Sequence, residues 1–186
     1  MLFHEIKLWP EKDFDIIYVD KHEAVQQIFL LNTIFEENNM EYCVVGGTLL
    51  GAIRHQGFMT WDDDVDYLME VKNIKKILEL KILENNDFTV EVLGSKVKDG
   101  NIVKAWKNNI HYDIWPFITN ENTIETHVGD FCINQTFPFR TTKFEDFTIK
   151  IPNNPKYFLD KTIPEWDKRI KIKYSKYNII FMVDRG

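Results

Sequence analysis

Four carboxylates are crowded into five residues, at Asp62, Asp63, Asp64 and Asp66. In a strand, residues two apart point to the same face, so Asp64 and Asp66 would project together and Asp62 would share their parity. Two carboxylates held that close repel each other unless a cation lies between them. Ligand sets made only of oxygen favour a hard divalent ion such as Mg²⁺. The spacing therefore predicts a metal site at Asp64 and Asp66.

Two other kinds of structure could account for the aspartates. An EF-hand loop starting at Asp62 would need glycine at its sixth position and glutamate at its twelfth, where the chain has Tyr67 and Asn73. That interpretation fails. A solvated acidic turn, or a set of N-caps for the following helix, explains the aspartates about as well as a metal site when they are considered alone.

A glycine pair precedes the aspartates at Gly46 and Gly47, with the hydroxyl of Thr48 next to it. Backbone N–H groups at a helix N-terminus bind phosphate, and glycine allows close approach. A lone glycine pair is usually a tight turn. Followed by Asp-x-Asp on the next strand, it would place an anion-binding turn beside a cation site. The combination favours phosphate-group transfer from a nucleotide, in which catalysis is mostly positioning and charge neutralisation.

The elements that must position these residues follow from hydrophobic periodicity. Asp20 is a candidate N-cap for the first helix, with Glu23 completing a capping box. Helices are predicted at 21–39, 48–55, 73–83 and 154–159. Strands are predicted at 42–45, 65–69, 88–93, 102–106, 111–117, 125–128, 131–133 and 147–151. This order predicts an α+β fold, a mixed β-sheet with helices packed on one side.

The composition narrows the class of protein. The chain has 186 residues, 44% of them hydrophobic, which is enough for one compact domain. The formal charge of −6 argues against a nucleic-acid polymer as partner, since phosphate neutralisation requires a basic excess. The cysteines, Cys43 and Cys132, do not make a disulfide scaffold. With no signal-peptide pattern and no apolar run long enough to span a bilayer, we expect a soluble protein of the cytoplasm or another intracellular compartment.

Four segments resemble the LicD family of phosphotransferases, which is related to fukutin and fukutin-related protein and has the nucleotidyltransferase fold. They are GGTLLGAIR at 46–54, WDDDVD at 61–66, HYDIWPF at 111–117 and FEDFTIKIP at 144–152. The resemblance covers residues 42–159 and implies one nucleotidyltransferase-like domain over 1–186. The chain departs from the family pattern at 162–166, where Tyr-Gly would be expected before the tryptophan.

The resemblance implies roles for the residues that surround a donor. Gly46, Gly47 and Thr48 would hold its phosphates. Arg54 would contact donor phosphate or structure the loop that follows the short helix.

The resemblance also implies a metal site. Asp64 and Asp66 would bind Mg²⁺, with Mn²⁺ as the alternative ion, and Asp62 would be an outer or additional ligand. Asp113 would be the third carboxylate, acting as metal ligand or as general base for the acceptor hydroxyl. The competing interpretations are a buried, hydrogen-bonded acid for Asp113 and an Asp62 or Asp63 ion pair for Arg54.

Three residues near these motifs receive no catalytic role. His55 and His111 are interpreted as structural, and Trp61 is interpreted as a core or loop anchor rather than a stacking platform. Trp115 is predicted to share a strand face with Asp113.

The function that these roles imply is Mg²⁺-dependent transfer of a phospho-alcohol group to a glycan hydroxyl. The expected donor is CDP-linked, of the CDP-choline or CDP-ribitol type, and CMP would leave. The alternatives are an NTP-dependent nucleotidyltransferase acting on a small molecule, a metal-dependent glycosyltransferase that uses a nucleotide sugar, and a descendant that only binds. A glycosyltransferase would leave Gly46-Gly47-Thr48 unexplained, and carboxylates at 64, 66 and 113 argue against the last.

Overall fold

The computed structural model describes residues 20–59, 62, 64–167, 169–174 and 179–184. Trp61 and Asp63 lie outside these ranges. The first half contains α1 Lys21–Glu37, β1 Tyr42–Val44, α2 Gly46–Arg54, β2 Asp64–Glu70, α3 Val71–Glu79, the 3₁₀ helix η1 Glu84–Asn86 and β3 Thr89–Gly94. The second half contains β4 Asn101–Lys107, β5 Ile110–Thr119, β6 Thr123–Thr126, β7 Gly129–Cys132, α4 Ile133–Thr136, β8 Arg140–Phe144, β9 Phe147–Ile151, α5 Pro155–Thr162, β10 Arg169–Tyr174 and β11 Ile179–Asp184.

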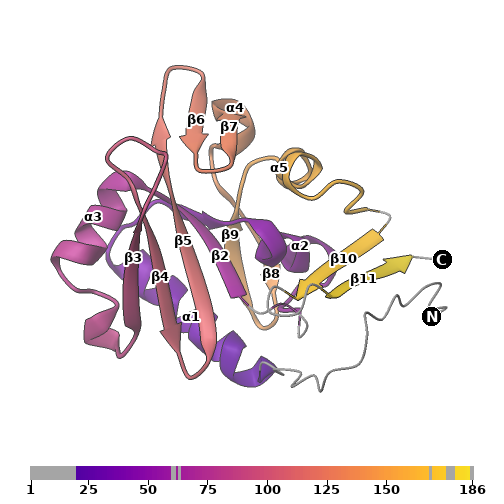
Figure 1. Ribbon diagram of the computed structural model, residues 1–186, viewed down its shortest axis with the longest axis horizontal. Helices are drawn as coiled ribbons and strands as arrows, with labels where there is room; N and C mark the ends of the chain where they lie inside the picture. Colours follow the sequence, from indigo (N-terminus) through magenta and orange to yellow (C-terminus); the bar gives the residue numbers. More distant parts are fainter. Residues whose placement is uncertain (1–19, 60–61, 63, 168, 175–178, 185–186) are drawn as a thin grey trace.

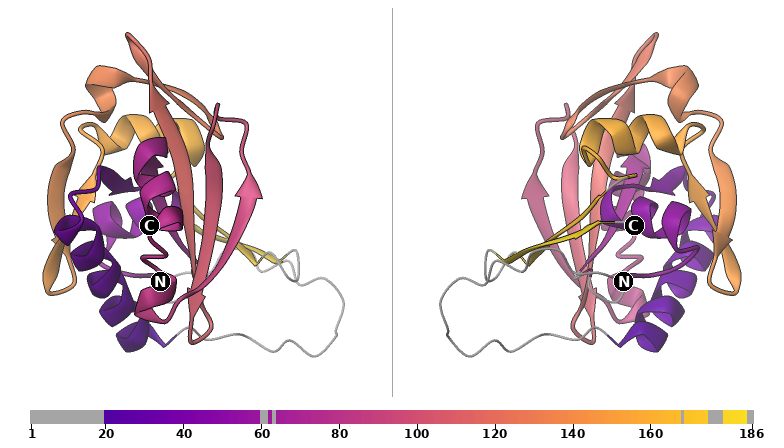
Figure 2. Two further views of the ribbon diagram at one scale, coloured as in Figure 1. Left: turned by 90° about the vertical axis from the view of Figure 1, so that its left-hand side faces the viewer. Right: turned by 90° about the vertical axis from the view of Figure 1, so that its right-hand side faces the viewer.

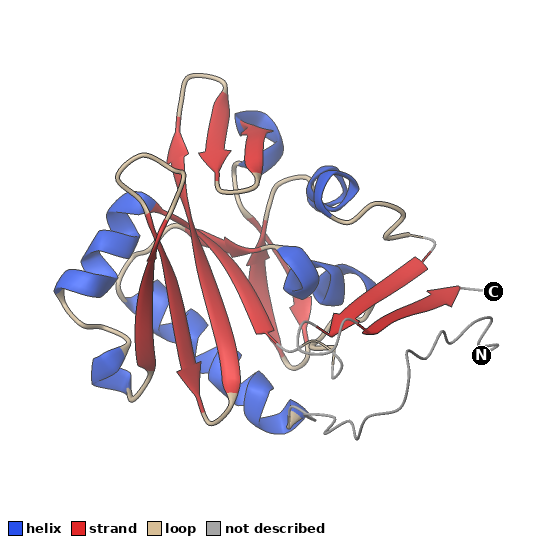
Figure 3. Ribbon diagram, in the orientation of Figure 1, coloured by secondary structure: helices blue, strands red, loops and turns tan. Residues whose placement is uncertain are grey.

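The main sheet has seven strands and is mixed, as predicted (Figures 1 and 3). The order of five of its strands across the sheet is β1-β2-β5-β4-β3, and β6 pairs with both β5 and β7. β2 and β5 are parallel, whereas the other neighbours in this sheet are antiparallel. The parallel pair lies at the centre of the sheet, flanked by β1 and β4, and it carries the aspartates of both predicted motifs.

One face of the sheet is covered by α1, which Figure 2 shows on one side of the strands. Asp20 caps this helix as predicted, and its carboxylate accepts from the His22 and Glu23 N–H groups. The side chain of Glu23 accepts hydrogen bonds from Gln27 and Asn108. The N-cap prediction is confirmed, and Glu23 ties α1 to the β4–β5 turn.

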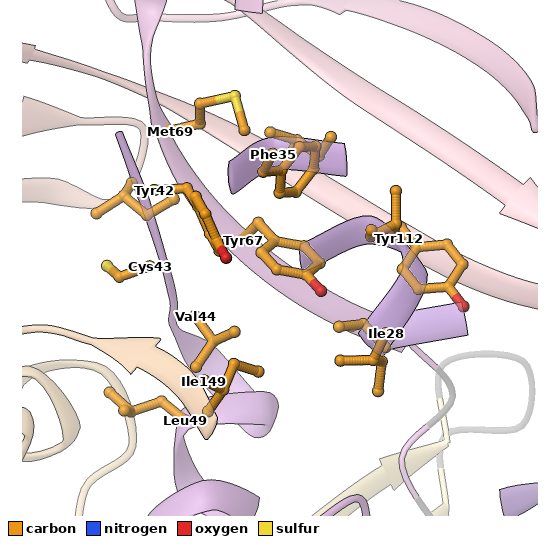
Figure 4. Close-up of a cluster of buried hydrophobic side chains, with 14 of the residues drawn as sticks. Ile28, Phe35, Tyr42, Cys43, Val44, Leu49, Tyr67, Met69, Tyr112 and Ile149 are labelled. Atoms are coloured by element: carbon orange, nitrogen blue, oxygen red, sulfur yellow. The ribbon is translucent and has the colours of Figure 1, made fainter. Parts of the chain in front are cut away.

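The core between α1 and the sheet is rich in tyrosine (Figure 4). Tyr67 and Tyr112 are fully buried, and their hydroxyls reach the α1 amides of Asn32 and Gln27, respectively. The Phe35 ring packs edge-on against Tyr67, with centroids 5.3 Å apart. Because these rings occupy one face of β2 and β5, the alternate residues of both strands must project from the other face.

Several predicted boundaries differ from the structure. Helix α3 begins at Val71 rather than 73, because Val71, Ile74 and Ile77 form one buried stripe. It ends at Glu79, and Lys81 follows with φ 49°. Strand β8 was not predicted because its sequence, RTTKF, is largely polar; it pairs with β9 as a separate two-stranded sheet.

Candidate active site

Three carboxylates meet where β2 and β5 run side by side. Asp66 lies directly opposite Asp113 in the parallel register, and Asp64 precedes Asp66 by two residues on the same face. One carboxylate oxygen from each of Asp64, Asp66 and Asp113 lies within 4.8 Å of the other two. The structure therefore brings together two motifs that are separated by about fifty residues in the chain.

The alternation of side chains explains why these acids face the solvent side. Val65 and Tyr67 are fully buried on the α1 face, whereas Asp64 and Asp66 are partly exposed on the opposite face. Asp113 is more deeply buried, with 6% of its surface exposed. A one-residue slip of β2 would exchange the two sets, so the apolar packing of the core fixes the direction of the acids.

Lys104 neutralises part of this charge. Its ammonium donates to both oxygens of Asp113, at 2.8 and 3.0 Å. Desolvation alone would lower the pKa of Lys104, but the hydrogen bond and charge of Asp113, with the charge of Asp64, raise it overall. Lys104 is therefore held as a cation at the edge of the acidic cluster.

Asp66 has a buried carboxylate that is held by two donors. Its pKa is raised from 3.8 to about 6, chiefly by burial and in addition by the charge of Asp113, while the hydrogen bond from Trp115 opposes the rise. Trp115 donates its indole N–H to Asp66 Oδ1 at 2.9 Å, and the Gly47 N–H also donates to this carboxylate. These donors orient Asp66, while burial and the neighbouring charge oppose its ionisation.

The glycine pair forms the first turn of α2 and lies against two of the aspartates. Gly46 has φ +55°, and a Cβ atom there would collide with the Asp66 carboxylate. A Cβ at Gly47 would collide with the carboxylate of Asp62, although Gly47 itself has no positive φ. Both glycines are therefore required by the close approach of acids, and a left-handed backbone is required only at Gly46.

The remaining residues of the glycine motif fasten α2 to β2. The Thr48 hydroxyl is buried and accepts the Asp66 backbone N–H at 2.9 Å. The Val45 N–H donates to the Asp66 carbonyl at 3.1 Å. Arg54 is the last residue of α2, and the nitrogens of its guanidinium are buried. At a rise of about 1.5 Å per residue, its Cα lies about 12 Å along the helix from Gly46, which favours the loop-structuring interpretation of Arg54.

The loop after α2 is held from two sides. A Cβ at Gly51 would lie 2.7 Å from the Gly57 carbonyl oxygen, so the third motif glycine allows the loop to fold back on the helix. Glu145, in the β8–β9 turn, accepts the Phe58 N–H at 2.9 Å and pairs with Lys21 at 2.9 Å. Its carboxylate occupies the space that a Cβ at Gly57 would need. This loop leads to Asp62.

The donor set suits a divalent cation. Mg²⁺ takes oxygen ligands at about 2.0–2.1 Å, so two ligand oxygens on one ion lie at most about 4.2 Å apart. The carboxylate oxygens of Asp64, Asp66 and Asp113 need only small side-chain movements to reach such a separation. Burial is the main cause of the raised pKa of Asp66, and the negative charge of Asp113 adds to it. Asp62 lies at Gly47 and is not part of this three-residue group.

Two participants in the site were not predicted from the sequence. Lys104 carries no motif, yet the pairing of β4 with β5 sets it opposite Asp113. Glu145 lies within a segment that resembles the family, but its contact with the α2 loop spans 87 residues. Trp115 does share the face of Asp113 as predicted, and its hydrogen bond to Asp66 was not expected. His111 is exposed and its ring stacks with Trp106, with centroids 6.2 Å apart.

No helix within the described ranges has the length and apolar character needed to cross a membrane.

Comparisons with known proteins agree with this geometry. The family model "LicD/FKTN/FKRP, nucleotidyltransferase domain" matches residues 39–154. The chain is 29% identical over 143 residues to ribitol 5-phosphate transferase FKRP of Homo sapiens, covering 68% of this chain and 28% of that protein. It is 35% identical over 68 residues to lipopolysaccharide cholinephosphotransferase LicD of Haemophilus influenzae, covering 33% and 26%.

A solved structure has the same fold. The crystal structure of ANT(2'')-Ia in complex with adenylyl-2''-tobramycin superposes with a TM-score of 0.54 at 14% identity, covering 76% of this chain and 79% of that chain. The chain spans about half or less of the length of the curated relatives it matches. With its α+β nucleotidyltransferase fold, its glycine turn and its aspartate triad, and with the family model matching more than half of its length, the chain belongs to the LicD family.

Proposed function

We propose that this chain transfers a phospho-alcohol group, of the phosphocholine or ribitol-phosphate type, from a CDP-linked donor to a glycan hydroxyl. The observation that carries the proposal is the carboxylate triad of Asp64, Asp66 and Asp113, whose oxygens lie within 4.8 Å of one another beside the first turn of α2. The two named relatives are transferases of ribitol 5-phosphate and cholinephosphate, which supports this class of transferred group. The proposed catalytic unit is a single domain.

In this proposal Asp64 and Asp66 hold Mg²⁺, or Mn²⁺ as the alternative, Asp113 is either a third ligand or the general base, and Asp62 is an additional or outer ligand. A bound divalent ion would neutralise phosphate charge and act as a Lewis acid. Gly46, Gly47 and Thr48, in the first turn of α2, would contact the donor phosphates. The Gly47 N–H already donates to the Asp66 carboxylate, so Gly47 would contribute by allowing the phosphate to approach closely. The Thr48 hydroxyl already accepts the Asp66 N–H, so Thr48 would contribute through its backbone.

Asp113 would act as the general base for the acceptor hydroxyl, the role we favour over that of a metal ligand. The acceptor oxygen would attack the phosphorus that carries the alcohol, its proton would pass to a carboxylate oxygen of Asp113, and CMP would leave with the bond electrons. Lys104 holds both Asp113 oxygens in the structure and would keep that carboxylate oriented. Arg54 would either reach donor phosphate or fix the loop that carries Asp62.

Binding and product assays test the proposal together. Thermal shift with Mg²⁺ should show stabilisation by CDP-choline or CDP-ribitol and none by UDP-sugars. Mass spectrometry should show CMP release together with a phospho-alcohol added to a glycan. Release of pyrophosphate from an NTP would instead indicate a nucleotidyltransferase, and sugar transfer from a nucleotide sugar would indicate a glycosyltransferase. Asp64→Asn should abolish turnover and Mg²⁺-dependent binding without unfolding the protein.

Asp113→Asn separates the two roles of that residue. The substitution keeps the shape and one oxygen but removes the proton acceptor, a role worth about 10²–10⁴-fold in rate. We expect Mg²⁺-dependent CDP affinity to stay close to that of the wild type while turnover falls by that factor. A parallel loss of affinity would make Asp113 a metal ligand, and unchanged turnover would leave it a structural acid.

A further inference from the structure

Two stacked rings lie on the sheet face that carries the carboxylates. Trp106 of β4 is the cross-strand partner of His111 of β5, and Lys104 is the partner of Asp113 two residues away along the strands. Because cross-strand partners and residues two apart project from the same face, all four side chains share the face of Asp113. The ring centroids of Trp106 and His111 are 6.2 Å apart, with an interplanar angle of 21°. We call these two residues the ring pair.

Burial distinguishes Trp106 from the other tryptophans that the structure describes. Trp115 and Trp166 pack against the hydrophobic core, and each donates its indole N–H to an aspartate. Trp106 is half-buried and lies outside that core, and His111 is exposed. A tryptophan placed in this way keeps a large apolar ring face for contacts outside the chain. The packing of the core therefore does not explain the ring pair.

The ring pair and the glycine turn lie on opposite sides of the carboxylates. Strands β1 and β5 flank β2, and β4 lies beyond β5. Helix α2 follows directly from β1, and Gly46 lies against the Asp66 carboxylate, so the proposed phosphate site is on the β1 side of the triad (Figure 1). In phosphoryl transfer the attacking and leaving oxygens are roughly in line. The acceptor is therefore expected to approach from the side of β5 and β4, where the ring pair lies.

The spacing on the sheet suits one sugar ring. Trp106 is the diagonal neighbour of Asp113 across β4 and β5, and the Cα atoms of such neighbours are about 7–8 Å apart. A pyranose ring with its hydroxyls spans a similar distance, so a ring stacked on Trp106 can place a hydroxyl at Asp113. Lys104 and its cross-strand partner Glu91 are accessible beside the ring pair. They offer a hydrogen-bond donor and an acceptor for other hydroxyls.

The chemistry around the ring pair favours a neutral sugar over other ligands. The face of an aromatic ring carries partial negative charge, and a pyranose presents axial C–H groups of partial positive charge. A phosphate group would be repelled by Asp64, the strand partner of His111, and by the exposed carboxylate of Glu91. An aliphatic chain would desolvate these charges without hydrogen-bonding to them.

We propose that the ring pair binds a sugar ring of the acceptor glycan and presents one of its hydroxyls to Asp113. The inference rests on the proposed function, because it takes a glycan as the acceptor and Asp113 as the carboxylate that meets its hydroxyl. It adds the surface on which that glycan lies. Trp106 supplies the stacking face, and His111 holds the Trp106 ring and belongs to the binding surface.

Saturation-transfer NMR on the full chain tests this surface. The probes are methyl β-glucopyranoside, methyl β-galactopyranoside and methyl N-acetyl-β-glucosaminide, which are uncharged and carry axial C–H groups. At least one probe should receive saturation from the wild type, most strongly at its axial ring protons. Trp106→Ala should abolish this transfer, whereas Trp106→Phe keeps a ring face and should retain part of it. Because Trp106 lies outside the core, both variants should fold with a melting temperature close to that of the wild type.

The matched control is Phe29→Ala. Phe29 is a 53% exposed aromatic residue of α1, which covers the opposite face of the sheet, so this substitution should leave the sugar signals unchanged. Equal saturation transfer in the wild type and Trp106→Ala would overturn the inference. Absence of transfer from the wild type to all three probes would overturn it as well.

Calorimetry with CDP and Mg²⁺ separates this inference from the proposed function. The CDP affinity of Trp106→Ala should equal that of the wild type, because the donor lies on the other side of the triad. A weaker CDP affinity in Trp106→Ala would overturn the inference, since the ring pair would then stack on the donor base. If the wild type bound no CDP but still showed sugar signals that depend on Trp106, the CDP-linked donor would be refuted and the sugar-binding surface upheld.

Discussion

Replacing Asp66 by asparagine removes a buried negative charge that lowers the free energy of unfolding of the metal-free protein. Burial, with a further contribution from Asp113, raises the pKa of Asp66 from 3.8 to about 6. Each pKa unit corresponds to about 1.4 kcal/mol, so the ionised carboxylate destabilises the fold by about 3 kcal/mol. Asparagine keeps an acceptor for Trp115 but must turn N–H groups toward the Gly47 N–H, which costs about 1 kcal/mol. We expect Asp66→Asn to raise the free energy of unfolding by about 2 kcal/mol at pH 8.

The sign of the pH dependence follows from the direction of the pKa change. The pKa of Asp66 is higher in the folded state than in the unfolded state. Its contribution to the free energy of unfolding is therefore most favourable below pH 3.8, where the carboxyl group is protonated in both states. This stability is lost as the pH rises through about 6. The Asp66→Asn variant lacks this titration. Its advantage over the wild type should therefore appear between pH 4 and 6 and stay constant above.

Urea unfolding in EDTA from pH 4 to pH 8 measures this difference. Thermal denaturation at pH 8 in EDTA gives the same comparison. The melting temperature of the variant should be about 4–8 °C higher than that of the wild type, at about 2–4 °C per kcal/mol for a chain of this size. Asp160→Asn is the control of opposite sign, because hydrogen bonds from Lys156 and Trp166 lower the pKa of Asp160 and its charge favours folding. An Asp66→Asn variant less stable than the wild type at pH 8 in EDTA would refute the reasoning.

Three further substitutions address the glycine turn and the cation of the site. Gly47→Val should displace the Asp62 carboxylate. Calorimetry should then show Mg²⁺-dependent CDP affinity falling at least 10-fold, while the melting temperature changes little. Near-normal CDP affinity in the variant would contradict the role of Gly47 at the donor phosphates. Gly51→Ala puts a methyl group 2.7 Å from a backbone carbonyl and should cost about 1–3 kcal/mol in urea unfolding. Lys104→Met leaves Asp113 without its cation and should cost the metal-free protein about 1–3 kcal/mol, with Mg²⁺ stabilising the variant more than the wild type in thermal denaturation.

Two controls accompany these substitutions. Gly94→Ala meets no atom within 4 Å and should leave the free energy of unfolding within about 1 kcal/mol of the wild type or above it, which isolates the contact at Gly51. Lys72→Met removes an exposed lysine of α3 that pairs with Glu70 rather than with Asp113 and should not change the response to Mg²⁺. Equal Mg²⁺ stabilisation in Lys104→Met and the wild type would show that Lys104 does not compete with the ion.

Much of the site followed from local patterns in the chain. The alternation around Asp64 and Asp66 predicted their shared face, and the alternating burial along β2 confirms it, with Val65 and Tyr67 buried on the other face. The position of Lys104, which was not predicted, follows from the turn that joins β4 to β5. Asn108 and Asn109 both have positive φ and form a two-residue turn between β4 and β5, the conformation that asparagine adopts in tight hairpins. Counting back from that turn sets Lys104 opposite Asp113.

Contacts between segments distant in the chain could not be predicted in this way. The hydrogen bond from Trp115 to Asp66 depends on the register of two parallel strands, and no turn sets that register. A cavity beside Trp115 depends on how α5 docks against β7, because Phe158 and Phe131 form its far wall. Periodicity indicates that each of these elements exists, but it carries no information on which surfaces meet.

The contact made by Glu145 has a consequence for the order of assembly during synthesis. The glycine motif and Asp62 leave the ribosome well before Glu145, whose carboxylate holds the loop between them through Phe58. A nascent chain that ends before β8 would contain every carboxylate of the triad, yet the loop that leads to Asp62 would lack its clamp. Residues 140–151 therefore complete this loop late, and the position of Asp62 against Gly47 should be reached only after that hairpin has been translated and docked.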